Sequence, residues 1–554
     1  MRDAYSVSQV RAAEAKLMAL VPEGALMQRA AAGLASVCAG LLRDGVGGVY
    51  GARVVILAGT GDNGGDALYA GERLARRGAA VTTVQAGARI HGEAARALVG
   101  AGGRIVAVVP PGPDAMPTDL GGPAGQSGHG GQDRYDVGHE VRSAIGHADL
   151  IVDGLLGIGG KGGLREPYAT LAQLAASARN AVTVAVDLPS GIDADSGAVA
   201  GPAVRAQVTV TFGAVKPGLL IDPGAGQTGV VEFVDIGLGP YLDGPSAASA
   251  PQARDIAAML PRPTAESDKY RRGVLGLLTG SDRYTGAALL STGGAVHGGA
   301  GMVRLVTFPG AAAAVRPVHP EVVITELSGE TRTRSESPQP GPSDSSDSSD
   351  GGSLFPDDVS RVQAWTVGSG MGTDDAAARR LSAILATSLP VLIDADGLTL
   401  LARHRELLPR PAPTLLTPHA GELGRLLDAD PADIEARRLE YARRAAAQLG
   451  ACVLLKGSTT VIAPPDGLDP VLVNTTGTPW LATAGTGDVL AGLAGALLAQ
   501  GLLPPQAAIS AAYLHGLAAR IAARGGTEGE APIGASDVVR ALPLAFRAVS
   551  AQIA

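Results

Sequence analysis

The stretch that decides the fold is NTTGTPWLATAGTGDVLAGLAGALLAQG, residues 474–501. Its second half is apolar and of helix length, and Gly485-Thr486-Gly487-Asp488 stands where that helix would begin. Free backbone amides at a helix start can form an anion hole for a phosphoryl group in transfer. Asp488, at the same place, can act as general base toward a substrate hydroxyl. The plainer interpretation, an aspartate that caps a helix after a glycine turn, also fits these residues.

A second motif precedes this helix. LLKGSTTVI, residues 454–462, predicts two strands joined by a glycine turn that could cover an adenine or its phosphates. The chain contains no GxxxxGK[ST] sequence, which excludes a P-loop nucleotide site.

The C-terminal half continues outward from these motifs as an α/β domain, which we place at residues 254–554. Its predicted strands are VLGLLT, MVRLVT, EVVIT, AWTVG, PVLID, TLLT and CVLLK, with helical segments between several of them. Residues 328–353 interrupt this series with a Ser-, Pro- and Asp-rich sequence that we expect to be a disordered insert.

The N-terminal half shows the same alternation and is predicted to form a first domain at residues 1–239. A helical segment at residues 26–42 precedes the strand candidates RVVILA, AVTTVQ, RIVAVV, DLIVD and AVTVAVD. Residues 111–138 are expected to be a surface insertion, and residues 240–253 a linker. The predicted fold is therefore two three-layer αβα domains, each with a mostly parallel sheet.

Three turns of the first domain follow strands and carry polar or glycine residues. AGTGDNGGDA, residues 58–67, has GxGxxG spacing but lacks the acidic residue that a dinucleotide-binding dehydrogenase places after the next strand. In the other two turns Asp153 and Asp187 each end a strand, and Ser190 follows. An aspartate at a strand end often only stabilises a turn. Three such turns at one sheet edge favour a shared ligand site.

GTGDNGGDA, VDGLLGIG and VDLPSGID together resemble the YjeF N-terminal domain, the NAD(P)H-hydrate epimerase, over residues 6–239. The resemblance implies that a potassium ion is bound by Asn63, Asp153 and Ser190. It also implies that the substrate is held by Asn63, Gly64, Gly65, Asp66, Gly157, Gly159, Gly163 and Asp187. The family usually has asparagine where this chain has Asp62, so we do not count Asp62 as a site residue. Either Asp153 or Asp187 could move the proton, and Asp153 is our catalytic candidate.

The GxGD helix start resembles the ribokinase-like fold, and four further motifs narrow this resemblance. YTGA, VGSGMGTDD, VLIDADGL and TPHAGEL make residues 256–546 similar to the ADP- or ATP-dependent NAD(P)H-hydrate dehydratase. The similarity implies that Ala287, Gly370, His419 and Asp488 contact the hydrated nicotinamide nucleotide. It implies that Lys456, Gly457, Ser458, Thr459, Thr460 and Gly487 contact the adenine nucleotide. Asp394 and Asp396 could place a magnesium ion or cap a helix, and the sequence does not decide between these roles.

These resemblances imply a bifunctional repair enzyme: an epimerase for hydrated NADH and NADPH, and a dehydratase that uses ADP and magnesium and has Asp488 as catalytic base. Two rivals follow from the same motifs. One is a small-molecule kinase with a regulatory YjeF-type domain, and the other is a scaffold without catalysis. A scaffold would be expected to lose site residues, whereas Asn63, Asp153, Asp187 and Ser190 are all present.

The composition of the chain limits the classes of partner and the cellular locations that we expect. The net charge of −8 and the lack of a long Lys/Arg run argue against a nucleic-acid binder. Cys38 and Cys452 are too few for a disulfide framework, the N-terminus does not resemble a signal peptide, and no apolar run reaches membrane-span length. We therefore expect a cytoplasmic enzyme with small-molecule substrates that assembles as a homo-oligomer.

Overall fold

A computed structural model describes residues 1–108, 137–327, 361–467, 470–526 and 529–553. The chain divides into two compact units, Arg2–Ala248 and Ser249–Ala554, and this boundary falls inside the segment predicted to be a linker. The predicted insert at residues 328–353 lies outside the described residues, as does the predicted surface insertion up to residue 136.

The N-terminal unit is built on a seven-stranded sheet in the order β4-β3-β2-β5-β6-β7-β8, in which every neighbouring pair is parallel. The elements of this unit are β1 Arg2–Ala4, α1 Val7–Met18, α2 Ala25–Val46, β2 Arg53–Ala58, α3 Asp62–Arg76, β3 Ala80–Gln85, α4 Gly92–Gly100, β4 Arg104–Ala107, α5 Gly138–Gly146, β5 Leu150–Gly154, α6 Tyr168–Ser177, β6 Val182–Val186, β7 Val208–Phe212, η2 Pro217–Leu219, α7 Ala225–Thr228, β8 Val230–Val234 and η3 Gly239–Tyr241.

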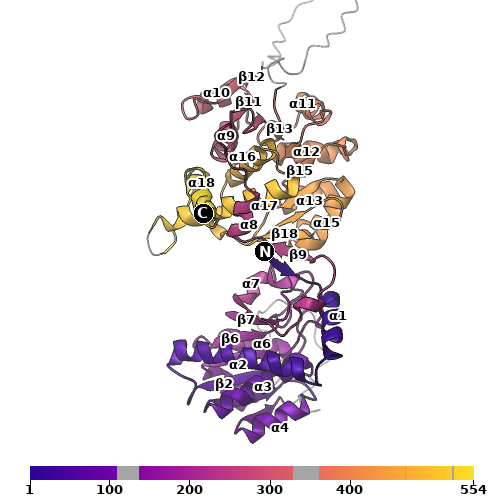
Figure 1. Cartoon of the computed structure of the whole chain (residues 1–554), viewed down its shortest axis with the longest axis vertical. Coiled ribbons are helices and arrows are strands. Elements are labelled where there is room, and N and C mark those ends of the chain that lie inside the picture. The colour runs from indigo at the N-terminus through magenta and orange to yellow at the C-terminus, as the bar shows by residue number, and fades with distance from the viewer. Residues whose placement is uncertain (109–136, 328–360, 468–469, 527–528, 554) are drawn as a thin grey trace, which may run out of the picture. The chain divides into compact units, whose positions relative to one another are not determined.

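Both faces of this sheet are covered, as the unbroken apolar run of β2 predicts. Val54 and Ile56 pack in one core cluster with residues of α1 to α4, whereas Val55 and Leu57 pack in another with residues of α5 and α6. Successive residues of a strand point to opposite faces, so the two clusters lie on opposite sides of the sheet. Figure 1 shows α2 and α3 side by side on one of these sides. The unit is therefore a three-layer αβα domain.

The C-terminal unit has a larger sheet, whose strands from β18 onward run in the order β18-β17-β16-β15-β14-β13-β10-β11-β12. The pairs from β16 to β12 are parallel, and β17 pairs antiparallel with both of its neighbours. Its elements are β9 Ala248–Ala250, α8 Ala253–Met259, β10 Val274–Leu278, α9 Thr285–His297, β11 Met302–Thr307, α10 Pro309–Val315, β12 Val323–Glu326, β13 Ala364–Val367, α11 Asp375–Leu385, β14 Val391–Ile393, α12 Ala395–Arg403, η5 Arg405–Leu407, β15 Thr414–Leu416, α13 Ala420–Leu427, α14 Pro431–Ala436, α15 Arg438–Leu449, β16 Cys452–Leu455, β17 Thr460–Ala463, β18 Val471–Asn474, η6 Pro479–Leu481, α16 Thr486–Ala499, α17 Pro504–Arg524 and α18 Ala535–Ser550.

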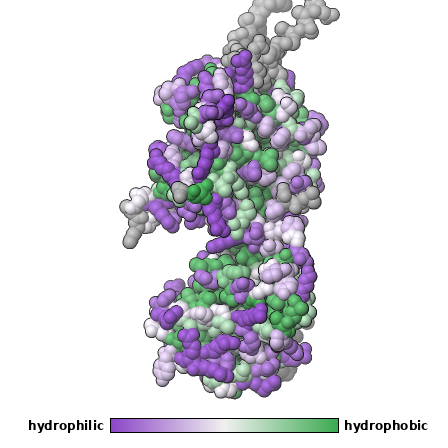
Figure 2. Space-filling view, viewed as in Figure 1, coloured by the Kyte–Doolittle hydropathy of each residue, from purple (hydrophilic) through white to green (hydrophobic). Residues whose placement is uncertain are grey.

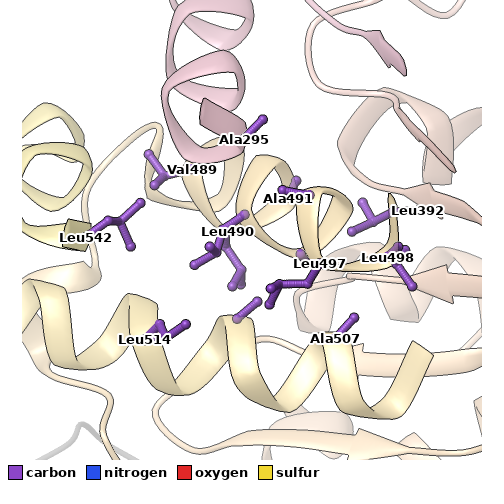
Figure 3. Packing of buried hydrophobic residues seen from close by; sticks show 14 of the residues in the cluster. Ala295, Leu392, Val489, Leu490, Ala491, Leu497, Leu498, Ala507, Leu514 and Leu542 are labelled. Carbon is purple, nitrogen blue, oxygen red and sulfur yellow. The ribbon is translucent and has the colours of Figure 1, made fainter. Parts of the chain in front are cut away.

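Helix α16 lies at the centre of this unit's core. In Figure 3, Leu490 and Leu497 of α16 point toward α17, where Leu514 and Ala507 lie. The helix also approaches α9 so closely that a Cβ on Gly492 would lie 1.9 Å from the carbonyl oxygen of Ser291. The apolar helix predicted after the GxGD motif is confirmed, and its burial on several sides explains why its sequence is apolar all round.

The strands predicted from apolar runs are confirmed, as are the fold class and the strand–turn–strand motif, which forms β16 and β17. Strands β1, β7, β8 and β18 were not predicted from the sequence, and β9 lies inside the segment predicted to be a linker. In the described part of the chain one helix, α2, is long and apolar enough to cross a membrane by length and composition alone, a test that core helices also pass. Seven of its residues are buried in the domain core. Figure 2 shows hydrophilic and hydrophobic residues mixed over the visible face of each unit.

Candidate active sites

The predicted turns of the N-terminal unit meet at one edge of its sheet. Strands β2, β5 and β6 are adjacent and parallel, so their carboxyl ends lie together, and the chain order reverses between β2 and β5. The amide of Gly59 donates to the carbonyl of Gly154 over 3.0 Å, which joins the first two turns. A Cβ on Gly59 would lie 1.8 Å from the carbonyl oxygen of Leu155, so only glycine allows this approach.

The three residues predicted to bind potassium lie together at this edge. Asn63 in the first turn of α3 donates through Nδ2 to the carbonyls of Leu156 and Val186. The Ser190 hydroxyl donates to Asp153 Oδ1 over 2.7 Å and is 3.3 Å from the same Leu156 carbonyl. One backbone oxygen therefore has both Asn63 and Ser190 beside it, and the site is rich in oxygen atoms.

Asp153 is fully buried, and its carboxylate is held by the two turns around it. Oδ2 accepts from the Ser190 amide over 2.8 Å, and Oδ1 accepts from the Leu155 amide over 3.2 Å. Burial raises the pKa of Asp153 to about 6, although the hydrogen bonds from Ser190 and Leu155 oppose this change. Asp153 therefore fixes the relative position of the β5 and β6 turns.

Asp187 forms an ion pair with a lysine that the sequence analysis did not single out. Lys216 is only 1% exposed, and its ammonium contacts Asp187 Oδ1 and also donates to the hydroxyl of Thr211 over 3.1 Å. The amide of Phe212 donates to the same Asp187 oxygen over 3.1 Å. Asp187 has a left-handed backbone with φ of 67°, an uncommon conformation that concentrates at functional sites.

Further acidic side chains surround this pair. Asp66 is buried with Oδ1 unpartnered among the described residues, and burial together with the charges of Asp187, Asp62 and Glu14 raises its pKa well above the usual value. Burial and the neighbouring Asp187 also raise the pKa of Glu14 on α1. Asp62, which the sequence analysis set aside, is exposed at the start of α3 and contributes to both shifts.

The predicted site glycines line these turns. Gly64 and Gly65 lie in the first turn of α3, where a Cβ on Gly65 would be 2.9 Å from the Met27 methyl group. A Cβ on Gly157 would be 2.5 Å from the Asn63 amide oxygen, and one on Gly163 would be 2.7 Å from Gly201 Cα. A side chain at each of these positions would collide with a neighbouring part of the domain, and at Gly157 that neighbour is Asn63. Whether their amides also contact a ligand stays a prediction.

In the C-terminal unit, α16 begins with the amides of the GxGD motif. Gly485 has φ of 87°, and a Cβ there would lie 2.4 Å from a Leu290 methyl group. The Thr486 hydroxyl donates to the carbonyls of Leu481 and Thr483, which fixes the turn before the helix. Asp488 then lies in the first helical turn, where the helix dipole and free amides favour negative charge.

Asp488 stands in a network of charged side chains. The Lys456 ammonium is 2.7 Å from Asp394 Oδ1 and 3.6 Å from Glu422 Oε2. Burial, with the charge of Asp394, raises the pKa of Asp488 to about 6, whereas Ser369 and Lys456 oppose the shift. Although burial lowers it, the charges of Asp394 and Glu422 leave the pKa of Lys456 raised. Lys456 therefore stays positively charged, and it lies near Asp488, whose pKa is raised.

The other predicted residues border this network. Gly457, Ser458 and Thr459 form the turn between β16 and β17, and Thr460 begins β17. The ring of His419 is largely exposed and caps α13, since its Nδ1 accepts from the Gly421 amide over 3.0 Å. His419 is therefore a helix-capping residue in this structure, and ligand contact by its outer nitrogen stays a prediction.

The structure brings together two residues that are distant in sequence. A Cβ added to Gly370, whose φ is 67°, would lie 3.2 Å from the Cβ of Ala287. The carbonyl of Ser369 beside it accepts from the Gly280 amide over 2.7 Å. The YTGA and VGSGMG motifs therefore lie together, and the Ser369 side chain interacts with Asp488.

Asp394 and Asp396 act differently from each other. Asp394 is buried and accepts from the hydroxyl of Thr417 over 2.9 Å in addition to Lys456, and its side chain makes no cap on α12. Asp396 accepts from the Gly372 amide over 3.0 Å. Within the described residues no group of three or more His, Cys, Asp or Glu side chains is arranged to hold a metal ion by itself.

Sequence reasoning missed three buried groups at these sites. Lys216 follows β7, which was not predicted. Glu422 completes a capping box with His419 and could have been found from their three-residue spacing. His515 of α17 lies against the Thr486 backbone, and burial lowers its pKa to about 4, so its imidazole is neutral at pH 7. No local pattern marks a residue of this kind.

Comparison with known proteins assigns both units. The family described as YjeF-related protein N-terminus matches residues 23–218, and the family NAD(P)H-hydrate dehydratase matches residues 275–539. The bifunctional NAD(P)H-hydrate repair enzyme Nnr of Mycobacterium leprae is 42% identical, covering 99% of this chain and all of the relative. The chain belongs to the bifunctional NAD(P)H-hydrate repair enzyme family. This membership confirms the resemblance found in the sequence.

Other members of this repair enzyme family are similar over most of their length. The enzyme of the same description from Mycobacterium tuberculosis is 44% identical, covering 92% of this chain and 91% of the relative. Among solved structures, the ADP/ATP-dependent NAD(P)H-hydrate dehydratase from Bacillus subtilis, co-crystallised with ATP and Mg²⁺, is 28% identical with a TM-score of 0.44. It corresponds to 54% of this chain and 97% of that chain.

Proposed function

We propose that this chain repairs hydrated NADH and NADPH. The N-terminal unit interconverts the two epimers at ring carbon six, and the C-terminal unit dehydrates one of them with ADP, giving AMP and phosphate. One observation carries the proposal. Asp488 lies at the amide-bearing start of α16 beside Lys456, in a chain whose family acts on this substrate class.

Dehydration follows from phosphoryl transfer. Hydroxide is a poor leaving group, so Asp488 first takes the proton of the carbon-six hydroxyl, and the oxygen attacks the terminal phosphorus of ADP while AMP departs. The amides at the start of α16 stabilise the charge in transfer. The carbon–oxygen bond then breaks, phosphate leaves with that electron pair, the ring nitrogen lone pair forms a double bond, and carbon five loses a proton to restore the dihydronicotinamide.

The charged residues around Asp488 suit a nucleotide and its metal ion. Lys456 offers a cation to the phosphates, and Asp394 and Asp396 offer carboxylate oxygens. Magnesium in phosphoryl-transfer sites is typically held by one or two carboxylates together with substrate phosphates, which this donor set fits. Bound there, magnesium would neutralise phosphate charge.

The oxygen atoms at the β5 and β6 turns fit potassium. Asp153, Ser190 and the Leu156 carbonyl offer oxygen donors, and Asn63, whose Nδ2 faces the Leu156 carbonyl here, would supply its amide oxygen by turning the amide group. Potassium there would offset the negative charge of Asp153 and of the substrate phosphates.

For epimerisation we favour Asp187 over Asp153 as the residue that moves the proton. Asp153 is fully buried, and both of its oxygens accept hydrogen bonds from the turns. Asp187 is held by Lys216, an ammonium that can stabilise the carboxylate or relay a proton. The hydroxyl leaves carbon six as water after protonation, and water returns to the opposite face of the ring.

The test starts from a mixed-epimer preparation of hydrated NADH. With ADP and magnesium, the chain should restore the 340 nm absorbance of reduced cofactor beyond the fraction present as one epimer, because the N-terminal unit resupplies the other. Recovery that stops at the one-epimer limit would disprove the epimerase assignment. No recovery with ADP or ATP would disprove the dehydratase and leave the kinase rival.

The raised pKa of Asp488 predicts the pH profile of dehydration. Only the carboxylate can accept a proton, so kcat with the single reactive epimer should rise with pH through a midpoint near about 6 and then level off. Initial rates measured between about pH 5 and 8 test this. A rate that is flat across this range would contradict a base with the pKa of Asp488.

We also propose a cytoplasmic location, which suits two cysteines that are both free and buried. The proposed substrates are small molecules, and we propose a homo-oligomer.

A further inference from the structure

Helix α1 precedes the residues matched by the N-terminal family, yet it borders the proposed epimerase site. Ser6 caps the helix, and the amide of Val7 donates to Asp195 Oδ1 over 2.7 Å. Asp195 belongs to the turn after β6, the turn that carries Asp187 and Ser190. Val10 and Leu17 are buried in the domain core. The helix is therefore fixed against the site at both its start and its apolar face.

Arg11 extends from α1 over the glycine turn after β5. Its Nη2 atom lies 3.0 Å from the position that a Cβ on Gly159 would occupy, so a larger residue at Gly159 would push the guanidinium away. Arg11 is exposed, and within the described residues it makes no hydrogen bond or ion pair. An available guanidinium thus lies on the turn that leads from Gly157 to Gly163.

The same face of α1 points to the proton-transfer residues. Glu14 is one helical turn beyond Arg11, and its pKa reflects, after burial, the nearby charges of Asp187 and Lys216, then those of Asp62 and Arg11. Arg11 therefore lies within the electrostatic range of the site. Arg11 is exposed at the edge of the proposed site, whereas Asp187 and Lys216 are buried inside it.

The charge of this site needs a further cation for an anionic dinucleotide. Glu14, Asp62 and Asp187 bring negative charge, and the buried Lys216 is already paired with Asp187. A guanidinium offers a planar fork of donors that matches phosphate oxygens, and it remains charged at every physiological pH.

We propose that Arg11 binds the diphosphate of the hydrated dinucleotide in the N-terminal unit. This inference rests on the proposed epimerase function and adds a binding residue to it. Because the diphosphate is common to both cofactors, Arg11 contributes equally to hydrated NADH and hydrated NADPH.

The test compares epimerisation kinetics of Arg11→Ala and Arg11→Lys with wild type and with Lys16→Ala. Lys16 is an exposed residue of the same helix, and among the described residues it pairs with Asp243 at the surface. Loss of a charge-assisted contact should lower kcat/KM of Arg11→Ala about 10- to 100-fold, mainly through KM, for both dinucleotides. Lysine keeps the charge without the fork and should give an intermediate value. Hydrated, reduced nicotinamide riboside has no phosphate, so both Arg11 variants should epimerise it with the same kcat/KM as wild type.

Three results would overturn the inference: equal kinetics for Arg11→Ala and Lys16→Ala, a loss confined to hydrated NADPH, or an equal loss with the riboside. The second would place Arg11 at the 2′-phosphate, and the third would give it a structural role. A wild-type chain that epimerises none of these substrates would instead disprove the proposed function, and the inference with it.

Discussion

Asp488→Asn should abolish restoration of NADH from the hydrated cofactor while leaving epimerisation intact. The amide cannot accept the hydroxyl proton, and general-base catalysis typically contributes about 100- to 10,000-fold. The substitution keeps the size of the side chain. Because burial raises the pKa of Asp488, its negative charge is already disfavoured, so the fold should tolerate the neutral amide. The measurement is the 340 nm rate with ADP and magnesium, beside chromatographic separation of the two epimers.

The matched control is Asp375→Asn. Asp375 also lies in the first turn of a helix, α11, and its side chain is exposed. It should leave both activities unchanged. If Asp488→Asn kept a rate within a few-fold of wild type, Asp488 would be the helix-stabilising residue of the plainer interpretation, and the base would have to be sought among its neighbours.

Lys216→Met should destabilise the N-terminal unit and remove epimerase activity. Breaking a buried ion pair by removing one partner leaves an uncompensated charge, which costs about 3–5 kcal/mol. The remaining partner, Asp187, is 6% exposed and would become protonated or recruit water. The expected result is a lower midpoint of chemical unfolding for this unit, with dehydration of the reactive epimer retained.

A double variant separates stability from chemistry. Asp187→Asn combined with Lys216→Met removes both charges, so it should be more stable than Lys216→Met alone and still lack epimerase activity. Lys16→Met breaks an exposed pair with Asp243 and should change stability by less than about 1 kcal/mol. Epimerase activity retained in the double variant would show that the ion pair serves only the fold.

The sequence predicted most of the sheet because its signals are local. An apolar run such as Arg53–Ala58 followed by glycines marks a buried parallel strand whatever surrounds it. The same holds for the helix that begins at Thr486. Strand β7 alternates threonine with apolar residues, a pattern typical of a half-buried strand, yet all five of its residues are buried. The pattern of β7 therefore does not show that this strand is buried on both faces.

The composition of each site was less predictable than its location. Asp153, Asp187 and Asp488 were found because strand ends and helix starts are where ligand groups collect. Lys216 was not found because a lysine is almost never fully buried unless paired, and the pairing depends on a partner 29 residues away. The position of the Arg11 side chain beside Gly159 likewise depends on contacts between distant parts of the chain.

The close approach of α16 and α9 has a mechanical consequence. Glycines on each helix face the other's backbone: a Cβ on Gly294 would lie 2.2 Å from the Val489 carbonyl oxygen, and Gly492 is equally confined by Ser291. Because the backbones of α16 and α9 are in contact, neither helix can slide or rotate against the other without a steric clash. The turn that carries Asp488 is therefore held in a fixed position by the contact between α16 and α9. Amide hydrogen exchange should be slowest in α16 and fast in the turn between β16 and β17.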